Sequence, residues 1–261
     1  VFQYIGWRGM LWIGVLPALA VVWIRVYVKE PDVWVQNQKN QKAQKAEMRA
    51  PLVAIFRRGM LGNTLNACWW MASGFVVYYS IFGLFATYLT RDLHMSPAAV
   101  GWPLVLTNAA TFVASFFWGA LSDKIGRRWG MIIPAILGFC ITPVYLLTTD
   151  YMTIVIAFTL QGACAGAVYG QNPSYLTERF PTEVRATAAA FCYHQGAIFA
   201  GLVAPVLTYV AVDMGFGFAR PMLVLTSVGL ISFIMALLLG PETRGKAMVA
   251  DLEIVPVAQI P

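Results

Sequence analysis

Seven long apolar runs constrain the fold of this chain more than any other feature. They cover approximately residues 10–28, 64–89, 98–120, 129–148, 152–176, 186–210 and 220–240. A helix rises ~1.5 Å per residue, so about 20 apolar residues cross the hydrocarbon core of a bilayer. Hydrophobic residues make up 59% of the chain and charged residues 11%, which excludes a soluble globular domain. The sequence therefore predicts an all-α integral membrane protein with seven transmembrane helices.

The distribution of Lys and Arg orients these spans. When residues 121–128 are placed in the cytoplasm and the spans alternate, fifteen of the 18 Lys and Arg fall on the inside. The three on the outside are Arg8, Arg91 and Arg220. Cytoplasmic segments of membrane proteins carry such an excess of basic residues. The net charge of +6 therefore reflects membrane topology and does not predict a nucleic-acid partner.

A short charged reversal joins the third and fourth spans and reads G-A-L-S-D-K-I-G-R-R over residues 119–128. Gly126 suits a turn that needs a positive φ. Asp123 is a single anion at the end of a membrane helix, where unpaired charge is costly, so we expect it to face a cation or a helix N-terminus. Judged by charge alone, an ordinary basic cytoplasmic loop is the alternative interpretation.

The pattern of this reversal resembles the inter-helix loop signature of the major facilitator superfamily. The matching residues are Gly119, Leu121, Ser122, Asp123, Lys124, Gly126, Arg127 and Arg128. In that family the signature lies between helices 2 and 3, and a second copy lies between helices 8 and 9. One span, a long basic linker and six further spans resemble the family from helix 6 onward, so the copy in this chain corresponds to the second one.

This resemblance implies a division of the chain into four parts. We expect residues 1–28 to be transmembrane helix 6 of a missing N-terminal half, and residues 29–63 to be a cytoplasmic linker. Residues 64–245 are then the C-terminal six-helix bundle, and residues 246–261 a cytoplasmic tail.

Two later junctions also resemble the superfamily. The pattern N-P-x-Y-x-x-E-x-F-P-x-x-x-R at residues 172–185 is similar to the helix 10–11 junction of sugar porters and metabolite:proton symporters. The run G-P-E-T-R-G at residues 240–245 is similar to the terminal motif of sugar porters. We expect the junctions to enclose one cytoplasmic mouth and to form a gating charge network of Asp123, Arg127, Arg128, Glu178 and Arg185.

Polar residues recur on two of the spans. In the second span, Asn66 and Ser73 are seven residues apart on one stripe, which either lines an aqueous cavity or packs against a neighbouring helix. In the fifth span, glycines at positions 162, 166 and 170 predict a smooth face for close helix contact. Gln161 and Asn172 fall on a different, polar face of that span.

His194 in the sixth span is the one ionisable His, Asp, Glu, Lys or Arg predicted near mid-membrane. An intramembrane ionisable residue is a candidate functional group, and histidine changes its charge near neutral pH. The alternative is a neutral histidine in a packing seam with Ala190, Ala197 and Gly201. The candidate substrate-binding residues are Asn66, Trp70, Ser73, Gln161, Tyr169, Asn172, Tyr193, His194 and Gln195. We expect Asn66, Ser73, Gln161, Asn172 and Tyr193 to face one central cavity.

These features predict a secondary transporter and not an enzyme. The sequence has no P-loop for ATP, and its four cysteines lack metal or redox spacing, so neither a cofactor nor a metal is predicted. The resemblance to bacterial sialate- and lactate-type symporters implies that a small carboxylate crosses the inner membrane with a proton. The predicted partners are that substrate, H⁺, the lipid bilayer and the missing N-terminal half. A sugar porter, an aromatic-acid porter, a transport-inactive fragment and a transporter-like sensor remain alternatives.

Overall fold

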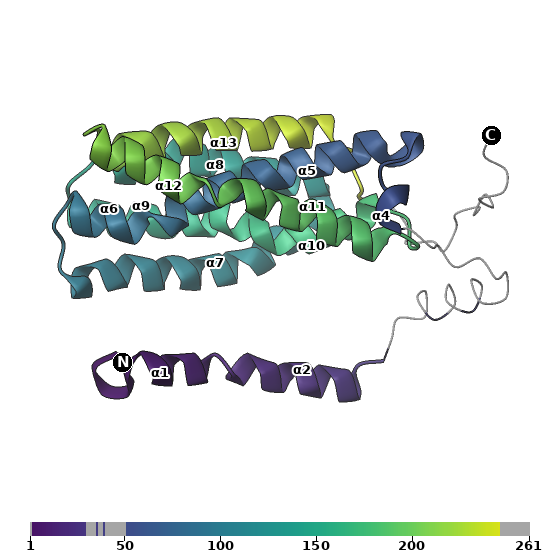
Figure 1. Ribbon diagram of the computed structural model, residues 1–261, viewed down its shortest axis with the longest axis horizontal. Coiled ribbons are helices and arrows are strands. Elements are labelled where there is room, and N and C mark those ends of the chain that lie inside the picture. Colours follow the sequence, from purple (N-terminus) through teal and green to yellow (C-terminus); the bar gives the residue numbers. More distant parts are fainter. Residues whose placement is uncertain (1, 30–34, 36–38, 40–50, 246–261) are drawn as a thin grey trace. The chain divides into compact units, whose positions relative to one another are not determined.

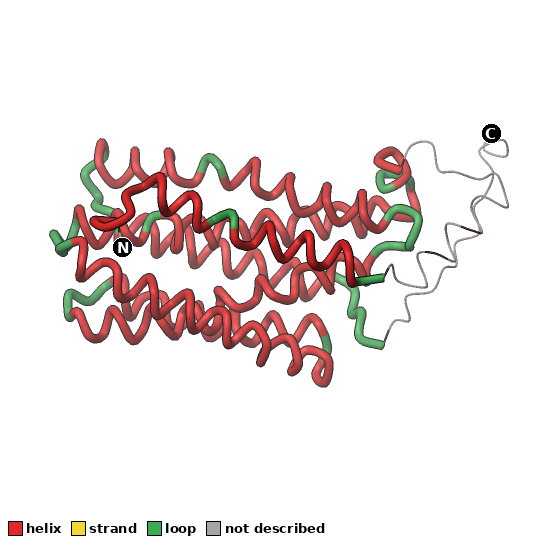
Figure 2. Tube along the Cα trace, turned by 90° about the horizontal axis from the view of Figure 1, so that it is seen from below, coloured by secondary structure: helices red, strands yellow, loops and turns green. Residues whose placement is uncertain are grey.

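The computed structural model describes residues 2–29, 35, 39 and 51–245 (Figure 1). Most of the predicted linker and the whole predicted tail, residues 246–261, lie outside the described residues. Every regular element in the described part is a helix, as Figure 2 shows. Seven helical segments within it are long and apolar enough to cross a membrane. The prediction of an all-α protein with seven spans is therefore confirmed.

The N-terminal unit contains α1 (Phe2–Ile13) and α2 (Leu16–Tyr27). Residues Gly6–Tyr27 form its candidate span. The side chains of α2 are exposed throughout, and most of them are apolar. Such a surface requires an apolar environment, which a bilayer provides.

The second unit is a bundle that begins with the short α4 (Pro51–Ala54). Its first span combines α5 (Arg58–Tyr78), η1 (Tyr79–Gly83) and α6 (Phe85–Arg91). Helix α5 starts before the predicted bundle boundary at residue 64, because residues 58–63 continue the helix beyond the apolar run. The next two spans are α7 (Pro97–Ile125) and α8 (Arg127–Leu146).

The remaining spans complete the six-helix bundle. One combines α9 (Tyr151–Gln161), η2 (Gly162–Gly166), η3 (Ala167–Gln171) and α10 (Asn172–Arg179). Another combines α11 (Arg185–Ala200), α12 (Val203–Thr208) and η4 (Tyr209–Asp213). The last is α13 (Ala219–Leu239). Segments η1, η2 and η4 are π-helical and η3 is a 3₁₀-helix, so three of these spans change helical geometry along their length.

Aromatic packing forms much of the bundle core. The rings of Phe85 and Phe158 stack at 3.5 Å between centroids, and the Tyr145 ring meets Phe158 edge-on at 5.4 Å. Trp70 is fully buried and packs edge-on against Tyr175 at 4.9 Å. These contacts join α5, α6, α8, α9 and α10 into one core.

The predicted glycine face is confirmed. A Cβ atom on Gly162 would lie 2.5 Å from Thr107 Cγ2, and one on Gly166 would lie 2.9 Å from Thr111 Oγ1. At Gly170 the same atom would lie 2.9 Å from Ser115 Cβ. The four-residue repeat on η2 and η3 thus matches a four-residue repeat on α7, which allows the two backbones to approach closely.

Candidate substrate cavity and charge network

A cavity of about 450 Å³ lies among four of the spans. We call it the aromatic cavity, and it is lined by Phe75, Tyr78, Phe82, Leu104, Thr107, Asn108, Thr111, Phe158, Gly166, Tyr169 and Tyr193. Helix α7 supplies Thr107, Asn108 and Thr111, whereas the other spans supply the rings. None of these lining residues is charged. The cavity can therefore enclose a small organic body but offers no ion pair to it.

The rings of the aromatic cavity contact one another. Phe75 meets Tyr193 edge-on at 5.0 Å between centroids, and Tyr78 lies 5.3 Å from Tyr169. Aromatic side chains supply large apolar contact surfaces at little cost in conformational entropy. Polar side chains are also available on α7, where Asn108 is exposed and Thr111 is partly exposed.

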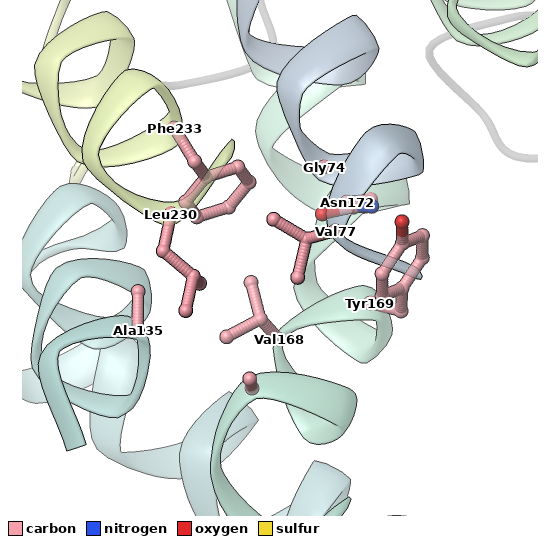
Figure 3. Close-up of a pocket in the computed structure, with 9 residues that line it drawn as sticks. Gly74, Val77, Ala135, Val168, Tyr169, Asn172, Leu230 and Phe233 are labelled. Carbon is pink, nitrogen blue, oxygen red and sulfur yellow. The ribbon is translucent and has the colours of Figure 1, made fainter. Parts of the chain in front are cut away.

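Behind this cavity lies a smaller void of about 20 Å³, shown in Figure 3. Leu230, Phe233 and Val168 point into it from opposite sides, and Asn172 and Tyr169 lie at one edge. A void of this volume has room for about one water molecule. It is too small for an organic solute, so Asn172 lies in the packed interior beside the aromatic cavity.

Two of the predicted substrate-binding residues, Tyr169 and Tyr193, line the aromatic cavity. Residues of the α5 stripe lie elsewhere, because they bond to α13. Asn66 Nδ2 donates to the Ala236 carbonyl at 2.9 Å, and the Ser73 hydroxyl lies 2.8 Å from that of Ser232. Trp70 is buried between α10 and α13. The stripe thus packs against α13, the alternative that its spacing left open, although Asn66 also borders a second cavity described below.

The other predicted residues are also separated from the aromatic cavity. Gln161 is fully buried, and its amide faces the position of Gly138 on α8. Gln195 Nε2 donates to the carbonyls of Cys68 and Cys192 at 2.8 and 2.9 Å, which ties α11 to α5. His194 is exposed on α11 beside the ring of Tyr193. Of the five side chains expected to face one cavity, Tyr193 lines the aromatic cavity. Ser73 and Gln161 lie in helix seams, whereas Asn172 borders the smaller void and Asn66 borders a separate cavity.

At the end of the bundle where α7 meets α8, Arg127 links two junctions. Its Nη2 and Nε atoms donate to Glu178 Oε1 at 2.9 and 3.1 Å, and its Nη1 pairs with Asp123. The hydroxyl of Thr243 also donates to Glu178, at 2.6 Å. We call Asp123, Arg127, Glu178, Thr243 and Glu242 the charge network. It brings together the α7–α8 junction, α10 and the segment after α13.

Glu242 was not among the predicted charge residues. Its Oε1 accepts the backbone N–H of Arg127 at 2.9 Å, and its Oε2 accepts that of Arg128 at 3.2 Å. It therefore caps the N-terminus of α8, where a carboxylate is favoured by the helix dipole. Gly126 has φ 107°, and a Cβ there would lie 2.7 Å from Glu242 Oε2, so the turn needs glycine for two reasons. Glu242 lies in the G-P-E-T-R-G motif that the sequence analysis identified, but its spacing did not indicate a partner for the carboxylate.

Arg128 and Arg185 bind carbonyls at other points. Arg128 Nη2 donates to Leu238 O at 2.6 Å, at the end of α13. Arg185 Nε donates to the carbonyls of Thr177 and Phe180 at 2.8 and 3.2 Å. The last carbonyls of a helix lack intrahelical partners, so Arg185 satisfies the end of α10. The structure thus places Arg185 at the α10–α11 turn and not in the charge network.

The family model described as Major Facilitator Superfamily matches residues 74–253. A cis,cis-muconate transport protein of Acinetobacter baylyi is 25% identical over 217 residues, which cover 82% of this chain and 52% of that protein. The sialic acid transporter NanX of Escherichia coli is 26% identical, with 92% and 57% covered. A probable 4-methylmuconolactone transporter of Cupriavidus pinatubonensis is 30% identical, with 93% and 55% covered. The chain spans about half the length of these relatives. It is an integral membrane protein that belongs to the Major Facilitator Superfamily.

Proposed function

We propose that this protein moves a small organic carboxylate across the bacterial inner membrane by secondary transport, together with a proton. The observation that supports this function best is the aromatic cavity of about 450 Å³ among the spans. Pockets that hold small organic ligands have volumes of roughly 300–1,000 Å³. Transporters place such sites near the bilayer midplane and alternate access around them.

The lining favours a planar or ring-shaped body. Phe75, Tyr78 and Tyr193 offer ring faces and edges, while Asn108 and Thr111 offer polar side chains. Two of the relatives are named for cis,cis-muconate and sialic acid, which supports an organic acid as the substrate class. The lining carries no cation, so the charge of such an acid is compensated by the accompanying proton or by a group outside this cavity.

His194 is our candidate for the proton within the described spans. The Asp and Glu residues of these spans lie in their terminal turns, whereas His194 lies within α11. The competing proposal places the proton on a carboxylate outside the described residues. Concentrative uptake that persists and stays pH-dependent in His194→Gln would assign the proton to such a carboxylate.

Uptake into proteoliposomes tests the proposed function. The protein produced from its native gene is reconstituted, and labelled cis,cis-muconate or lactate is added with an inward proton gradient. We expect concentrative uptake that a protonophore abolishes. Tyr169→Ala should raise the half-saturating concentration roughly tenfold, as loss of an aromatic contact of about 1.4 kcal/mol implies. Tyr209→Ala, which changes an exposed ring on η4, is the matched control.

A sugar porter is the second candidate, because residues 240–245 match the sugar-porter terminal motif. Competition by unlabelled hexoses, without competition by organic acids, would favour it. Binding of either class without any uptake would instead favour a transporter-like sensor.

A further inference from the structure

Arg179 ends α10 as a buried cation, with 5% of its surface exposed. Its Nε donates to Asn63 Oδ1 at 2.9 Å, and its Nη2 donates to Asn66 Oδ1 at 2.6 Å. The ring of Tyr175 lies 5.1 Å from its Cζ. All of these partners are neutral, in contrast to the two carboxylates that pair with Arg127.

Within residues 51–245, no carboxylate lies within ion-pair distance of Arg179, and its Nη1 has no hydrogen-bond partner. A buried charge without a counter-ion is costly. The orientation of both asparagine amides is fixed, because Asn63 Nδ2 donates to Arg179 O and Asn66 Nδ2 donates to Ala236 O. Rotating either amide would break one of these hydrogen bonds. Their oxygens hold the guanidinium in place but leave its charge uncompensated.

Arg179 also lines a cavity of about 410 Å³ at the cytoplasmic end of the bundle. Its other lining residues are Gly62, Asn63, Asn66, Leu239, Gly240 and Pro241. The linings of this cavity and the aromatic cavity share no residue. We call it the Arg179 cavity.

We propose that the Arg179 cavity is a binding site for an oxyanion, and that a small free carboxylate occupies it. A guanidinium is the side chain best suited to carboxylate and phosphate oxygens, because its planar donors match their geometry. The site lies apart from the aromatic cavity, so it holds whether or not the proposed transport function does. A cytoplasmic anion could therefore bind there without competing with a solute in the aromatic cavity.

Thermal unfolding in neutral detergent tests this site with acetate as the probe. The protein produced from its native gene is heated in increasing sodium acetate, with sodium chloride at matched ionic strength as the baseline. Ligand that binds only the folded state raises the unfolding midpoint in a saturable way. We expect this rise in the unaltered protein. We also expect it in Arg58→Gln, which removes an exposed cation from the same end.

Two variants should lose the response for different reasons. Arg179→Gln removes the charge, and its apparent affinity for acetate should fall roughly tenfold or more. Asn63→Asp supplies a carboxylate beside Arg179, so it should occupy the guanidinium and abolish the response while the protein remains folded. The proposal is overturned if acetate has no effect beyond chloride, or if both variants respond like the unaltered protein.

Nanodiscs distinguish the source of the oxyanion. Acetate should stabilise the protein equally in phosphatidylcholine discs and in discs that also contain phosphatidylglycerol. If phosphatidylglycerol stabilises the protein through Arg179 and removes the acetate response, a lipid phosphate occupies the site and the free-carboxylate proposal is wrong. Another outcome is that the unaltered protein shows no acetate response, whereas neutral variants of Asp251 and Glu253 show one. In that case the chain's own carboxylates occupy the Arg179 cavity, and the proposal is overturned.

Discussion

Glu242 accepts backbone hydrogen bonds from two parts of the chain, the start of α8 and the segment that follows α13. Besides the two N–H groups of α8, its Oε1 accepts those of Thr243 and Arg244 at 2.9 and 3.0 Å. One carboxylate therefore satisfies the start of α8 and folds the segment after α13 back on itself. An amide in its place accepts weaker hydrogen bonds and loses the interaction with the helix dipole.

Glu242→Gln should lower the free energy of unfolding by ~1 kcal/mol, the usual cost of a lost helix cap. Thermal or denaturant unfolding in detergent measures this change. Asp213→Asn, which removes an exposed carboxylate at the other end, is the control and should stay within ~0.5 kcal/mol. Equal stabilities of the two variants would remove the capping role.

If the proposed transport function holds, the Arg127–Glu178 contact should bias the protein between an inward- and an outward-facing state. A partly exposed pair contributes ~1 kcal/mol at most, so Arg127→Gln should shift the ratio of the two states by roughly fivefold. The alkylation rate of Thr111→Cys in the aromatic cavity, measured from each side of the membrane, reports this ratio. Lys124→Gln, in the same turn, is the matched control. An unchanged ratio in Arg127→Gln, or no effect of Asp123→Asn on transport, contradicts the gating proposal.

Asp150 caps α9 at the opposite end. Its Oδ2 accepts hydrogen bonds from the Thr153 hydroxyl and backbone N–H at 2.6 and 2.8 Å, and these bonds lower the pKa of the Asp150 carboxyl. Because the folded state has the lower pKa, the stabilisation is present above the unfolded-state pKa and is lost as the pH falls through the folded-state pKa. Asp150→Asn still caps the helix but does not titrate. The difference in unfolding midpoint between the two proteins should therefore shrink on acidification, and a constant difference contradicts this assignment.

The sequence predicted one part of the charge network and missed another. Arg127 and Glu178 belong to recognisable motifs on spans that must end at the same surface, and their contact is present. Glu242 could not be assigned, because its partners are backbone N–H groups that carry no sequence signal. Arg179 was also missed, because its partners on α5 become apparent only when the ends of α5 and α10 meet.

At the scale of whole helices, the changes of geometry were not predictable from apolar runs. Hydropathy measures the length of a span, whereas a π- or 3₁₀-helical stretch depends on the neighbouring helix. Segments η2 and η3 lie where their glycines pack against α7, and both contribute lining to the aromatic cavity. Such irregular stretches are frequent at functional sites and hinges. We therefore expect this part of the span to be sensitive to added side-chain volume.

Gly166→Ala should lower the free energy of unfolding by ~1–3 kcal/mol, because its Cβ would overlap Thr111 Oγ1. Gly119→Ala on α7 meets nothing within 4 Å and should be neutral or slightly stabilising. Unfolding of the two variants in the same detergent makes the comparison. If Gly166→Ala keeps the free energy of unfolding of the unaltered protein, α7 can move to accommodate the added methyl group and the prediction is wrong.

For the molecule as a whole, the number and type of elements followed from hydropathy, and the family followed from motifs at the span junctions. The aromatic cavity did not follow, because aromatic residues occur on every face of these apolar spans. Tyr169 and Tyr193 were identified, whereas Phe75 and Asn108 were not. Asn66 and Ser73 were placed in a cavity because a polar stripe lines water in one context and packs against a helix in another.

From Arg58 to Gly245, every Asp, Glu, Lys and Arg lies in a terminal turn of a span or in a junction. Moving one elementary charge through a potential of 100 mV changes its energy by ~2.3 kcal/mol. A rocking motion that keeps both ends of the bundle at the membrane surfaces carries none of these charges through the field. The reorientation of the empty bundle should therefore be electrically silent, and any voltage dependence should arise from the solute and its proton. Net uptake of a monocarboxylate with one proton should then be independent of an imposed potassium diffusion potential, because the charges of the solute and the proton cancel, and a steep dependence on voltage would contradict this expectation.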